Sequence, residues 1–160
     1  MIRISTACIC LLLVAGVGNA QQPDALRDSD LVVASLPHAS DTATTRRMLG
    51  APRQIQAPKR NDDGVQLITW DYAGLAVSFD STGRRYLADI TSSAHRMRRG
   101  VRIGDPISKV RQAYGVPSYA DSSHLLYVRS NNESETRGIT FLFAAGRLTR
   151  IVVGEVISVE

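Results

Sequence analysis

A short motif recurs at a distance of 65 residues, and it sets the main constraint on how this chain folds. Gly50-Ala51-Pro52 and Gly115-Val116-Pro117 each follow a segment that has helical periodicity. Glycine fits the position just after a helix, and a proline two residues later prevents the helix from continuing. The motif therefore predicts two related units in one chain, and such repeats have to be identified before a fold is assigned.

The second unit has the clearer helix, expected over residues 105–114. Asp105 fits the N-cap position, and the proline after it fits the first helical position, where a missing N–H costs nothing. One apolar face is formed by Ile107, Val110 and Tyr114. The corresponding segment 40–49 of the first unit has Ser40 as its expected cap and contains three threonines, which lower its helix propensity.

Each helix is followed by a loop and by segments that alternate apolar and polar residues, as half-buried strands do. The expected strands are 68–72, 75–79 and 85–91 in the first unit and 125–129, 139–143 and 148–153 in the second. A unit of about 55 residues buries too little apolar surface to be stable alone, so the two units are expected to share one core. The predicted fold class is α+β: two helix-plus-three-strand repeats form one antiparallel sheet of about six strands, with both helices on one face.

The predicted organisation assigns each part of the chain to one role. Residues 1–20 form a signal peptide, 21–34 a loose N-terminal segment, 35–91 the first repeat, 92–99 a basic connector and 100–160 the second repeat.

The signal peptide is predicted from the three parts that secretory signals share. Arg3 provides the positive start, an apolar stretch runs from Ala7 to about Val17, and Gly18 and Ala20 precede a cleavage point before Gln21. The apolar stretch is shorter than the roughly 20 residues that span a bilayer. We therefore expect a protein that is periplasmic or secreted after cleavage.

The two cysteines of the chain, Cys8 and Cys10, both lie in this signal peptide. They are placed too early for a lipoprotein signal, and their removal leaves a mature chain without disulfides, thiolate chemistry or cysteine metal ligands. The mature chain carries 18 basic and 15 acidic residues, a net charge of +3.

A helix that ends in Gly-x-Pro, followed by an aromatic strand and a Gly-turn hairpin, resembles the BamE/SmpA/OmlA type of small envelope protein. The second unit matches best, through Gly104-Asp105-Pro106-Ile107-Ser108-Lys109-Val110 and Tyr114-Gly115-Val116-Pro117. The tandem arrangement, over residues 36–154, is similar to the β-lactamase inhibitor protein fold. The resemblance implies an envelope or secreted protein that binds other proteins, as an assembly factor or as an inhibitor. The chain departs from both groups, because it has neither a lipid-bearing cysteine nor cysteines for disulfides.

The sequence contains no catalytic constellation and predicts no enzyme, no cofactor and no metal. His38, His95 and His124 lie in separate segments without a second ligand at metal-binding spacing. The sequence has no Gly-x-Ser-x-Gly, no Ser-x-x-Lys in a suitable context and no His-Glu-x-x-His. A hydrolase site formed only in three dimensions stays as a third hypothesis that no sequence feature supports.

The leading hypothesis places a protein partner on the open face of the sheet or on its rim. Tyrosine and arginine are favoured residues at protein interfaces. The expected partner-binding residues are Tyr127, Arg129, Arg150 and Asp71. The competing interpretation is an antiparallel sheet that simply faces water on one side.

The alternative hypothesis is a binder of anionic envelope components, phospholipid or lipopolysaccharide. Residues 84–111 hold eight basic and two acidic residues, a net charge of +6. Such a patch attracts anionic surfaces, and nucleic acid fits less well because the patch lacks interleaved aromatic residues. The expected anion-binding residues are Arg96, Arg98, Arg99 and Arg102. A solvated connector in an arginine-rich protein is the simpler explanation of the same charges.

Overall fold

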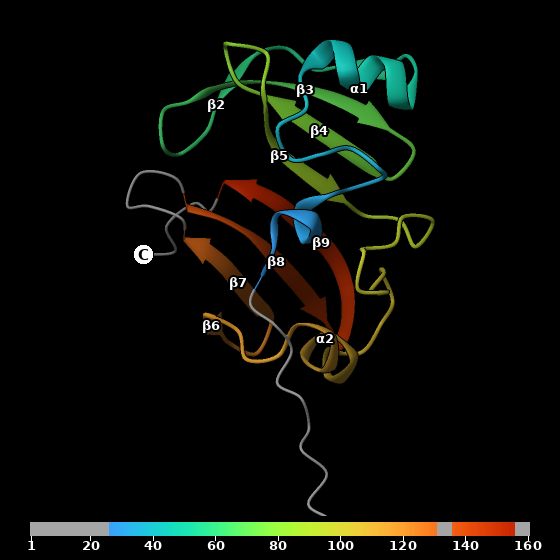
Figure 1. Cartoon of the computed structure of the whole chain (residues 1–160), viewed down its shortest axis with the longest axis vertical. Coiled ribbons are helices and arrows are strands. Elements are labelled where there is room, and N and C mark those ends of the chain that lie inside the picture. The colour runs from blue at the N-terminus through green and yellow to red at the C-terminus, as the bar shows by residue number, and fades with distance from the viewer. Residues whose placement is uncertain (1–25, 131–135, 156–160) are drawn as a thin grey trace, which may run out of the picture.

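The computed structural model describes residues 26–130 and 136–155 (Figure 1). The expected signal peptide, with its two cysteines, lies outside these residues. None of the helices within the described ranges is long and apolar enough to cross a membrane.

Most of the regular structure in these ranges is sheet. The helices are the 3-10 helix η1 (Asp28–Leu31), α1 (Thr42–Leu49) and α2 (Ile107–Tyr114). The strands are β1 (Gln54–Ile55), β2 (Lys59–Arg60), β3 (Gln66–Tyr72), β4 (Leu75–Phe79), β5 (Arg85–Ile90), β6 (Tyr119–Ala120), β7 (His124–Ser130), β8 (Thr136–Ala144) and β9 (Arg147–Glu155).

The nine strands of the described ranges belong to one antiparallel sheet. Its order is β1-β3-β4-β5-β9-β8-β7-β6, and β2 pairs with β3 on the same side as β1. The pairing of β5 with β9, from Leu87↔Gly154 to Ile90↔Ile151, joins the N-terminal half (residues 40–91) to the C-terminal half (residues 105–155). Figure 1 shows this joint between the upper group of strands and the lower one.

The predicted architecture of two helix-plus-three-strand repeats in a sheet of about six strands is wrong. The sheet has nine strands, and the two α-helices have only eight residues each. The extra strands β1, β2 and β6 lie in the segments after each Gly-x-Pro motif, and they add short pairings to β3 and β7. Each has two residues, which is too short to show the alternation by which a strand is recognised in a sequence.

One face of the sheet carries the core, and we call it the covered face. A cross-strand row on this face runs through paired residues of seven strands: Ile55, Trp70, Val77, Ala88, Val153, Ile139 and Tyr127. Apart from Leu67 and Leu126, the buried apolar residues of the described ranges form a single cluster that spans both halves. Because burial of apolar area is the main driving force for folding, the two halves stabilise each other through this common core.

Both α-helices end in the way that the Gly-x-Pro motif predicts. Gly50 and Gly115 have φ of 81° and 79°, and their N–H groups donate to the carbonyls four residues earlier. A tyrosine from a following strand donates its hydroxyl to each glycine carbonyl, Tyr72 to Gly50 at 3.4 Å and Tyr127 to Gly115 at 3.1 Å. The helix starts differ by one residue from the expectation, because Asp41 and Pro106 are the N-caps.

Residues 26–41 form an N-terminal segment that packs on the covered face. The prediction of a loose segment over 21–34 is wrong for the residues that the structure describes, because Asp30, Leu31 and Val33 are buried. The segment turns back on itself through reciprocal hydrogen bonds between Val33 and Leu36. Figure 1 shows it in front of the strands, running from the lower group to the upper group.

Two arginines hold this segment in place. The Arg85 guanidinium, which is buried, donates to the carbonyls of Leu31 at 2.9 Å and Leu36 at 3.3 Å. Arg99 donates from Nε and Nη2 to the two carboxylate oxygens of Asp30, at 3.0 and 2.6 Å. Such a paired, charge-assisted contact is among the stronger hydrogen-bonding arrangements in proteins.

Candidate functional site

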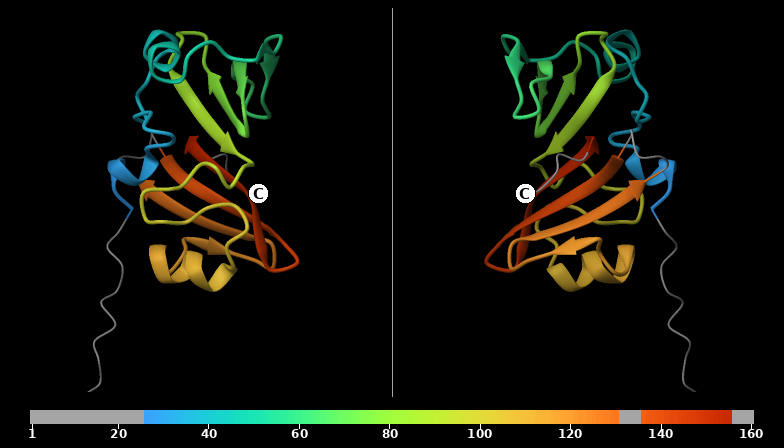
Figure 2. Two further views of the ribbon diagram at one scale, coloured as in Figure 1. Left: turned by 90° about the vertical axis from the view of Figure 1, so that its right-hand side faces the viewer. Right: turned by 90° about the vertical axis from the view of Figure 1, so that its left-hand side faces the viewer.

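The second face of the sheet is not covered by any helix of the described ranges. α2 packs on the covered face through Tyr114, which contacts Tyr127 and Phe141, and α1 lies on that face too, with Arg46 over the Trp70 ring. In both views of Figure 2, η1 and α1 lie to the same side of the strands. We call the opposite side of the sheet the uncovered face.

The uncovered face extends over both halves of the molecule. One row of paired residues crosses it: Tyr119, Leu126, Thr140, Val152, Asp89, Ala76 and Asp71. At the β3 end, the loop between β1 and β2 curls beside Leu67 and Thr69 and encloses a hollow of about 250 Å³. The face is therefore a long surface with a polar hollow at one end.

The two ends of this face differ in chemistry. In the C-terminal half it carries apolar side chains, Leu142 and Val152 among them, which are partly exposed. In the N-terminal half it is mixed, because Leu67, Ala76 and Leu87 share it with polar residues. There the hydroxyls of Thr69 and Ser78 are 2.7 Å apart, and Asp71 accepts from Gln56 Nε2 at 2.8 Å.

An ion pair lies on this face where the two halves meet. Arg150 of β9 donates from Nε to Asp89 Oδ1 at 2.9 Å and from Nη2 to Oδ2 at 2.5 Å. These hydrogen bonds raise the pKa of Arg150 above its ordinary value. The Arg150 side chain is still 50% exposed. It is held in one orientation and remains available to a partner, which reduces the entropy lost on binding.

Two of the four expected partner-binding residues lie on the uncovered face, and two do not. Arg150 and Asp71 are on it. Tyr127 is on the covered face, 4% exposed, between α2 and β8. Arg129 has the same orientation two residues further along β7, and its guanidinium pairs with Asp28 of η1. The prediction that Tyr127 and Arg129 face outward is wrong.

The error comes from the phase of one strand. Leu125, Leu126, Tyr127 and Val128 are four successive apolar residues, so the sequence of β7 does not show which alternate set is buried. A shift of one residue exchanges the two faces of a strand completely. The pairing of Tyr127 with Ile139 shows that Tyr127 belongs to the buried set of β7, because Ile139 is fully buried in the core.

The structure brings two of the four expected anion-binding arginines together, because Arg96 and Arg102 are partners in an isolated β-bridge. Arg99 turns inward to Asp30 and lies over the Tyr114 ring at 5.0 Å, so its assignment as a surface anion ligand is wrong. Arg96, Arg98 and Arg102 are exposed on the connector side.

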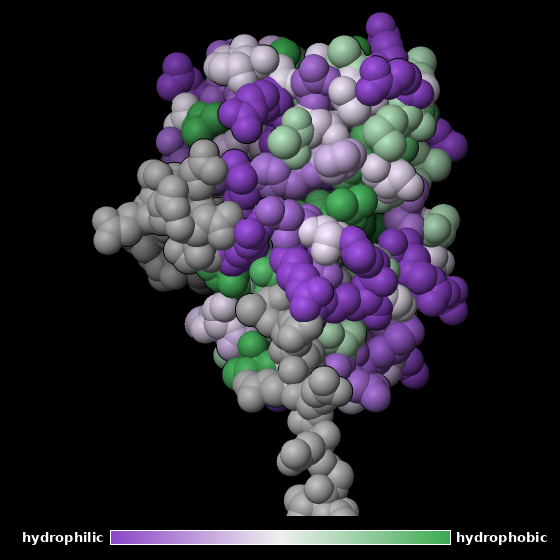
Figure 3. All heavy atoms as spheres, in the orientation of Figure 1, coloured by the Kyte–Doolittle hydropathy of each residue, from purple (hydrophilic) through white to green (hydrophobic). Residues whose placement is uncertain are grey.

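The net charge of +6 over residues 84–111 is also less available than the sequence suggests. Arg85 is buried, and Lys109 pairs with Asp105 at 2.8 Å. Arg85 and Arg99 are therefore engaged inside the protein, and Lys109 is paired on the surface. On the face that Figure 3 shows, which is the face seen in Figure 1, hydrophilic residues are spread over much of the surface.

The histidines show no metal or hydrolase geometry in the described ranges. No group of three or more His, Cys, Asp or Glu side chains there is arranged to hold a metal ion. His124 Nδ1 lies 2.9 Å from Ser123 Oγ and 3.1 Å from Asp121 Oδ2. A catalytic relay needs the serine and the carboxylate on different ring nitrogens, so this cluster is a turn contact.

Sequence reasoning missed two residues of the uncovered face. Tyr119, which is 45% exposed, lies in the two-residue strand β6, and no periodicity marks it. Asp89 lies in a segment that the sequence predicts as a strand, but its ion-pair partner Arg150 is 61 residues away in the chain. Only the β5–β9 register brings them together.

Comparisons with known proteins give a structural neighbour and no family. No family model matches the chain, and no curated protein matches it. The crystal structure of the uncharacterized protein yfeY from Escherichia coli is similar, with a TM-score of 0.50 and 14% sequence identity, over 79% of this chain and 97% of that one. At this identity the likeness concerns the fold alone. The resemblance to BamE-type proteins and to the β-lactamase inhibitor protein fold stays a prediction.

Proposed function

We propose that the protein is an exported, non-enzymatic protein-binding module of the bacterial cell envelope, and that its uncovered face receives the partner. The observation that carries this proposal is the uncovered face itself, with Arg150 fixed by Asp89 at its centre. An antiparallel sheet with one solvated face is common. This face differs from an ordinary solvated face because it combines an oriented arginine, partly exposed apolar residues and an exposed tyrosine at the edge. These residue types are favoured at protein interfaces.

The expected signal peptide and the resemblance to envelope proteins support the cellular part of the proposal. A mature chain that begins at Gln21 is periplasmic or secreted. Both groups that the chain resembles work by binding other proteins, which supports a role as an assembly factor or an inhibitor.

The alternative function, binding of phospholipid or lipopolysaccharide through residues 84–111, has less support. Arg85 and Arg99 make internal contacts and Lys109 pairs with Asp105 on the surface, so three of the eight cations of that segment already have partners within the protein.

The test introduces one bulky charge into the centre of the uncovered face. Thr140 is paired between Leu126 and Val152 and is partly exposed, so Thr140→Arg obstructs the face without entering the core. Ser108→Arg, on the exposed side of α2, is the matched control. The measurement is the amount of partner recovered by in-cell crosslinking and pull-down. We expect Thr140→Arg to recover about tenfold less partner than the native chain, and Ser108→Arg to recover the same amount.

A charge exchange sharpens the test. Arg150→Asp combined with Asp89→Arg preserves the ion pair but moves its positive member to β5. We expect folding to be preserved and partner recovery to fall. If both Thr140→Arg and this exchange retain all partners of the native chain, the uncovered face is not the binding surface.

A further inference from the structure

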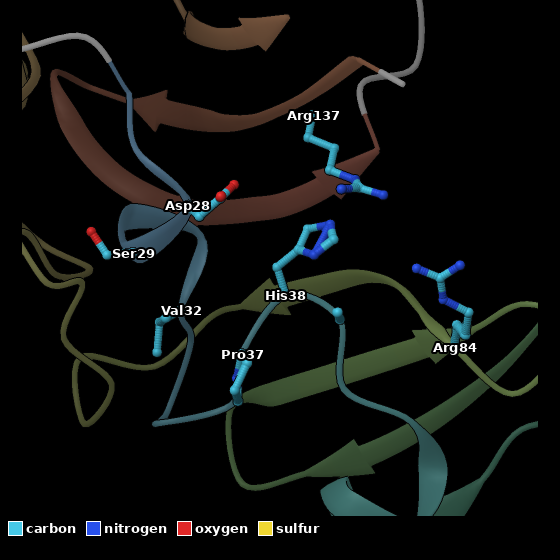
Figure 4. Close-up of a pocket in the computed structure, with 8 residues that line it drawn as sticks. Asp28, Ser29, Val32, Pro37, His38, Arg84 and Arg137 are labelled. Carbon is cyan, nitrogen blue, oxygen red and sulfur yellow. The ribbon is translucent and has the colours of Figure 1, made fainter. Parts of the chain in front are cut away.

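The middle of the covered face and its β1 end differ in what lies over them. In the middle, where the two halves meet, Asp28, His38 and Arg137 line a cavity of about 520 Å³ between the N-terminal segment and the sheet (Figure 4). At the other place, the cross-strand row of apolar residues continues through Trp70 to Ile55. Ile55 is 52% exposed, so the apolar face extends further than the helix that covers it.

Three apolar side chains lie together at the β1 end, and we call Ile55, Ile68 and Trp70 the Trp70 patch. Ile55 pairs with Trp70 across β1 and β3, and Ile68 is on the same face of β3 two residues earlier. Ile68 is 37% exposed, and the partly exposed Trp70 ring packs edge-on against buried Phe79 at 5.0 Å. Single exposed apolar residues are ordinary on a protein surface, whereas adjacent ones form a patch through which a protein can interact.

Exposed arginines lie beside this patch. The Arg46 guanidinium lies over the Trp70 ring at 5.7 Å, Arg47 follows it in α1, and Arg53 directly precedes β1. The carboxylate of Asp41, at the start of α1, is partly matched by Arg47: hydrogen bonds from Thr44 lower the pKa of Asp41, and the charge of Arg47 lowers it further. Arg46 and Arg53 have no ion pair with any described residue.

The distribution of charge, and not its sum, distinguishes this end of the molecule. Residues 40–91 hold seven basic and six acidic side chains. Apart from Asp41, the acidic ones make contacts away from the patch: Asp71 with Gln56 and Asp89 with Arg150 on the uncovered face, Asp62 at the hollow, Asp63 with Asn61, and Asp80 with the N–H groups of Thr82 and Arg84. The arginines beside the patch therefore keep a positive charge that these carboxylates do not neutralise locally.

We propose that the Trp70 patch docks the protein on the surface of an anionic lipid bilayer. Tryptophan is favoured at membrane interfaces, because its ring is apolar and its N–H is polar. Arginine lays its apolar stem along the hydrophobic region and keeps its charge at the lipid phosphates. Ile55 and Ile68 add apolar area that enters the boundary between headgroups and acyl chains.

A bilayer fits this patch better than a protein partner does. Three side chains cannot fill the roughly 800 Å² that each side of a stable protein interface buries. A partner strand would need a longer edge to pair with, since β1 has two residues. A membrane contact needs only a few inserted apolar side chains together with charge attraction.

This inference is independent of the proposed function, because the Trp70 patch shares no residue with the uncovered face. It also differs from the alternative function, which uses residues 84–111.

Trp70 is the only tryptophan of the chain, so its fluorescence reports on the patch directly. The purified protein is mixed with vesicles of phosphatidylcholine, or of phosphatidylcholine and phosphatidylglycerol in equal parts. With the anionic vesicles we expect a blue shift of the Trp70 emission and its quenching by brominated acyl chains, and at least about tenfold weaker binding to phosphatidylcholine alone. Salt at about 0.5 M should weaken the binding because it screens the charges.

Matched variants separate the patch from the rest of the surface. Ile55→Ser removes an apolar side chain from the patch, and Val116→Ser removes one that is 78% exposed in the C-terminal half. Arg46→Gln removes a cation beside the patch, and Arg111→Gln removes the cation at the equivalent position of α2. In vesicle sedimentation we expect about fivefold weaker binding for Ile55→Ser and Arg46→Gln, and less than about twofold for the two controls.

Quenching of Trp70 by anionic vesicles, together with these differences, supports the inference. It is overturned if the Trp70 emission does not respond, if phosphatidylcholine alone binds as tightly, or if the patch variants and their controls lose equally. Thr140→Arg, which obstructs the uncovered face, should keep its vesicle binding. Loss of vesicle binding in that variant would place the lipid contact on the uncovered face and would also overturn the inference.

Discussion

The two helices have the same length and the same ending, but they differ in what they bury. α2 places Val110 and Tyr114 in the core, and the Tyr114 ring lies 5.0 Å from Phe141 and 5.4 Å from Tyr127. α1 buries only Thr45, and its Met48 is exposed. At the 65-residue offset, Leu49 stands where α2 has Tyr114.

The difference shows that two separate properties are encoded in the repeated segment. The Gly-x-Pro motif determines where each helix ends, and it does so equally in both halves. The apolar residues before it determine how strongly each helix is attached, because most helix stability in proteins comes from packing of the apolar face. The C-terminal half should therefore depend on its helix more than the N-terminal half does.

Truncation of the two equivalent residues should show the largest contrast. Tyr114→Ala removes a buried ring and should lower the free energy of unfolding by about 3–5 kcal/mol. Leu49→Ala removes a partly buried side chain and should cost about 1–2 kcal/mol. Urea denaturation measures both.

Tyr114→Phe is the control for this pair. The Tyr114 hydroxyl is buried and has no hydrogen-bond partner in the part of the chain that the structure describes. Its removal should leave stability unchanged or raise it. Equal losses for Tyr114→Ala and Leu49→Ala would contradict the contrast between the helices.

The N-terminal segment should respond to acid at only one of its two anchors. It is attached to the connector between the halves by the Asp30–Arg99 ion pair, and to the N-terminal half by hydrogen bonds from Arg85 to the Leu31 and Leu36 carbonyls. Burial acts to raise the pKa of Asp30, but the hydrogen bonds from Arg99 and the Arg27 backbone N–H outweigh it, and the pKa lies below its ordinary value of 3.8.

The sign of the pH effect follows from that direction. A carboxylate with a lowered pKa in the folded state stabilises the protein above its unfolded pKa, and this contribution is lost as pH falls through the folded value. Asp30→Asn should cost about 2–3 kcal/mol at pH 7 and flatten the loss of stability below pH 4. Denaturant curves from pH 7 to pH 2.5 measure it, with the exposed Asp62→Asn as control. Parallel curves for the native chain and Asp30→Asn at low pH would rule out the anchor.

Local signals in the sequence located the longer elements well. β3, β4, β5, β7, β8 and β9 overlap the expected strands, because strands of five or more residues leave an alternating or apolar pattern in the sequence. The same reasoning could not find β1, β2 and β6, because pairing of two residues depends on a neighbour strand and not on their own pattern.

The candidate sites were less predictable because long-range register creates them. Arg150 was correctly placed on the uncovered face from its own alternation, whereas Tyr127 was misplaced because its neighbours are apolar on both sides. The Trp70 patch is formed only by the pairing of β1 with β3. The density of positive charge along the chain pointed to Arg99 as an anion ligand. The structure pairs Arg99 with Asp30 instead, which is 69 residues away in the chain and could not be recognised as its partner from the sequence.

The helix ends should tolerate change equally poorly, in contrast to the helix faces. Gly50 and Gly115 have φ near +80° with ψ of −162° and −140°, a region that other residues rarely adopt. An added Cβ at Gly50 meets no atom within 4 Å, so the cost there is backbone strain alone. Gly50→Ala and Gly115→Ala should each lower stability by about 1–2 kcal/mol. Thermal denaturation compares them, and a difference above about 1 kcal/mol would show that the motif is not equivalent in the two halves.

The smallest expected effect concerns Thr45 of α1 and Val110 of α2, which occupy equivalent positions in the two helices. Here a substitution in α1 should stabilise the protein, and the reverse substitution in α2 should destabilise it. Thr45 and Val110 are both fully buried, but the Thr45 hydroxyl has no hydrogen-bond partner among the described residues. Thr45→Val keeps the shape and removes the unsatisfied group, so it should raise the free energy of unfolding by about 1 kcal/mol, while Val110→Thr should lower it by a similar amount. Chemical denaturation of both variants checks this. If Thr45→Val is destabilising, the hydroxyl makes a contact that the packing of α1 requires, and α1 is attached by more than its apolar residues.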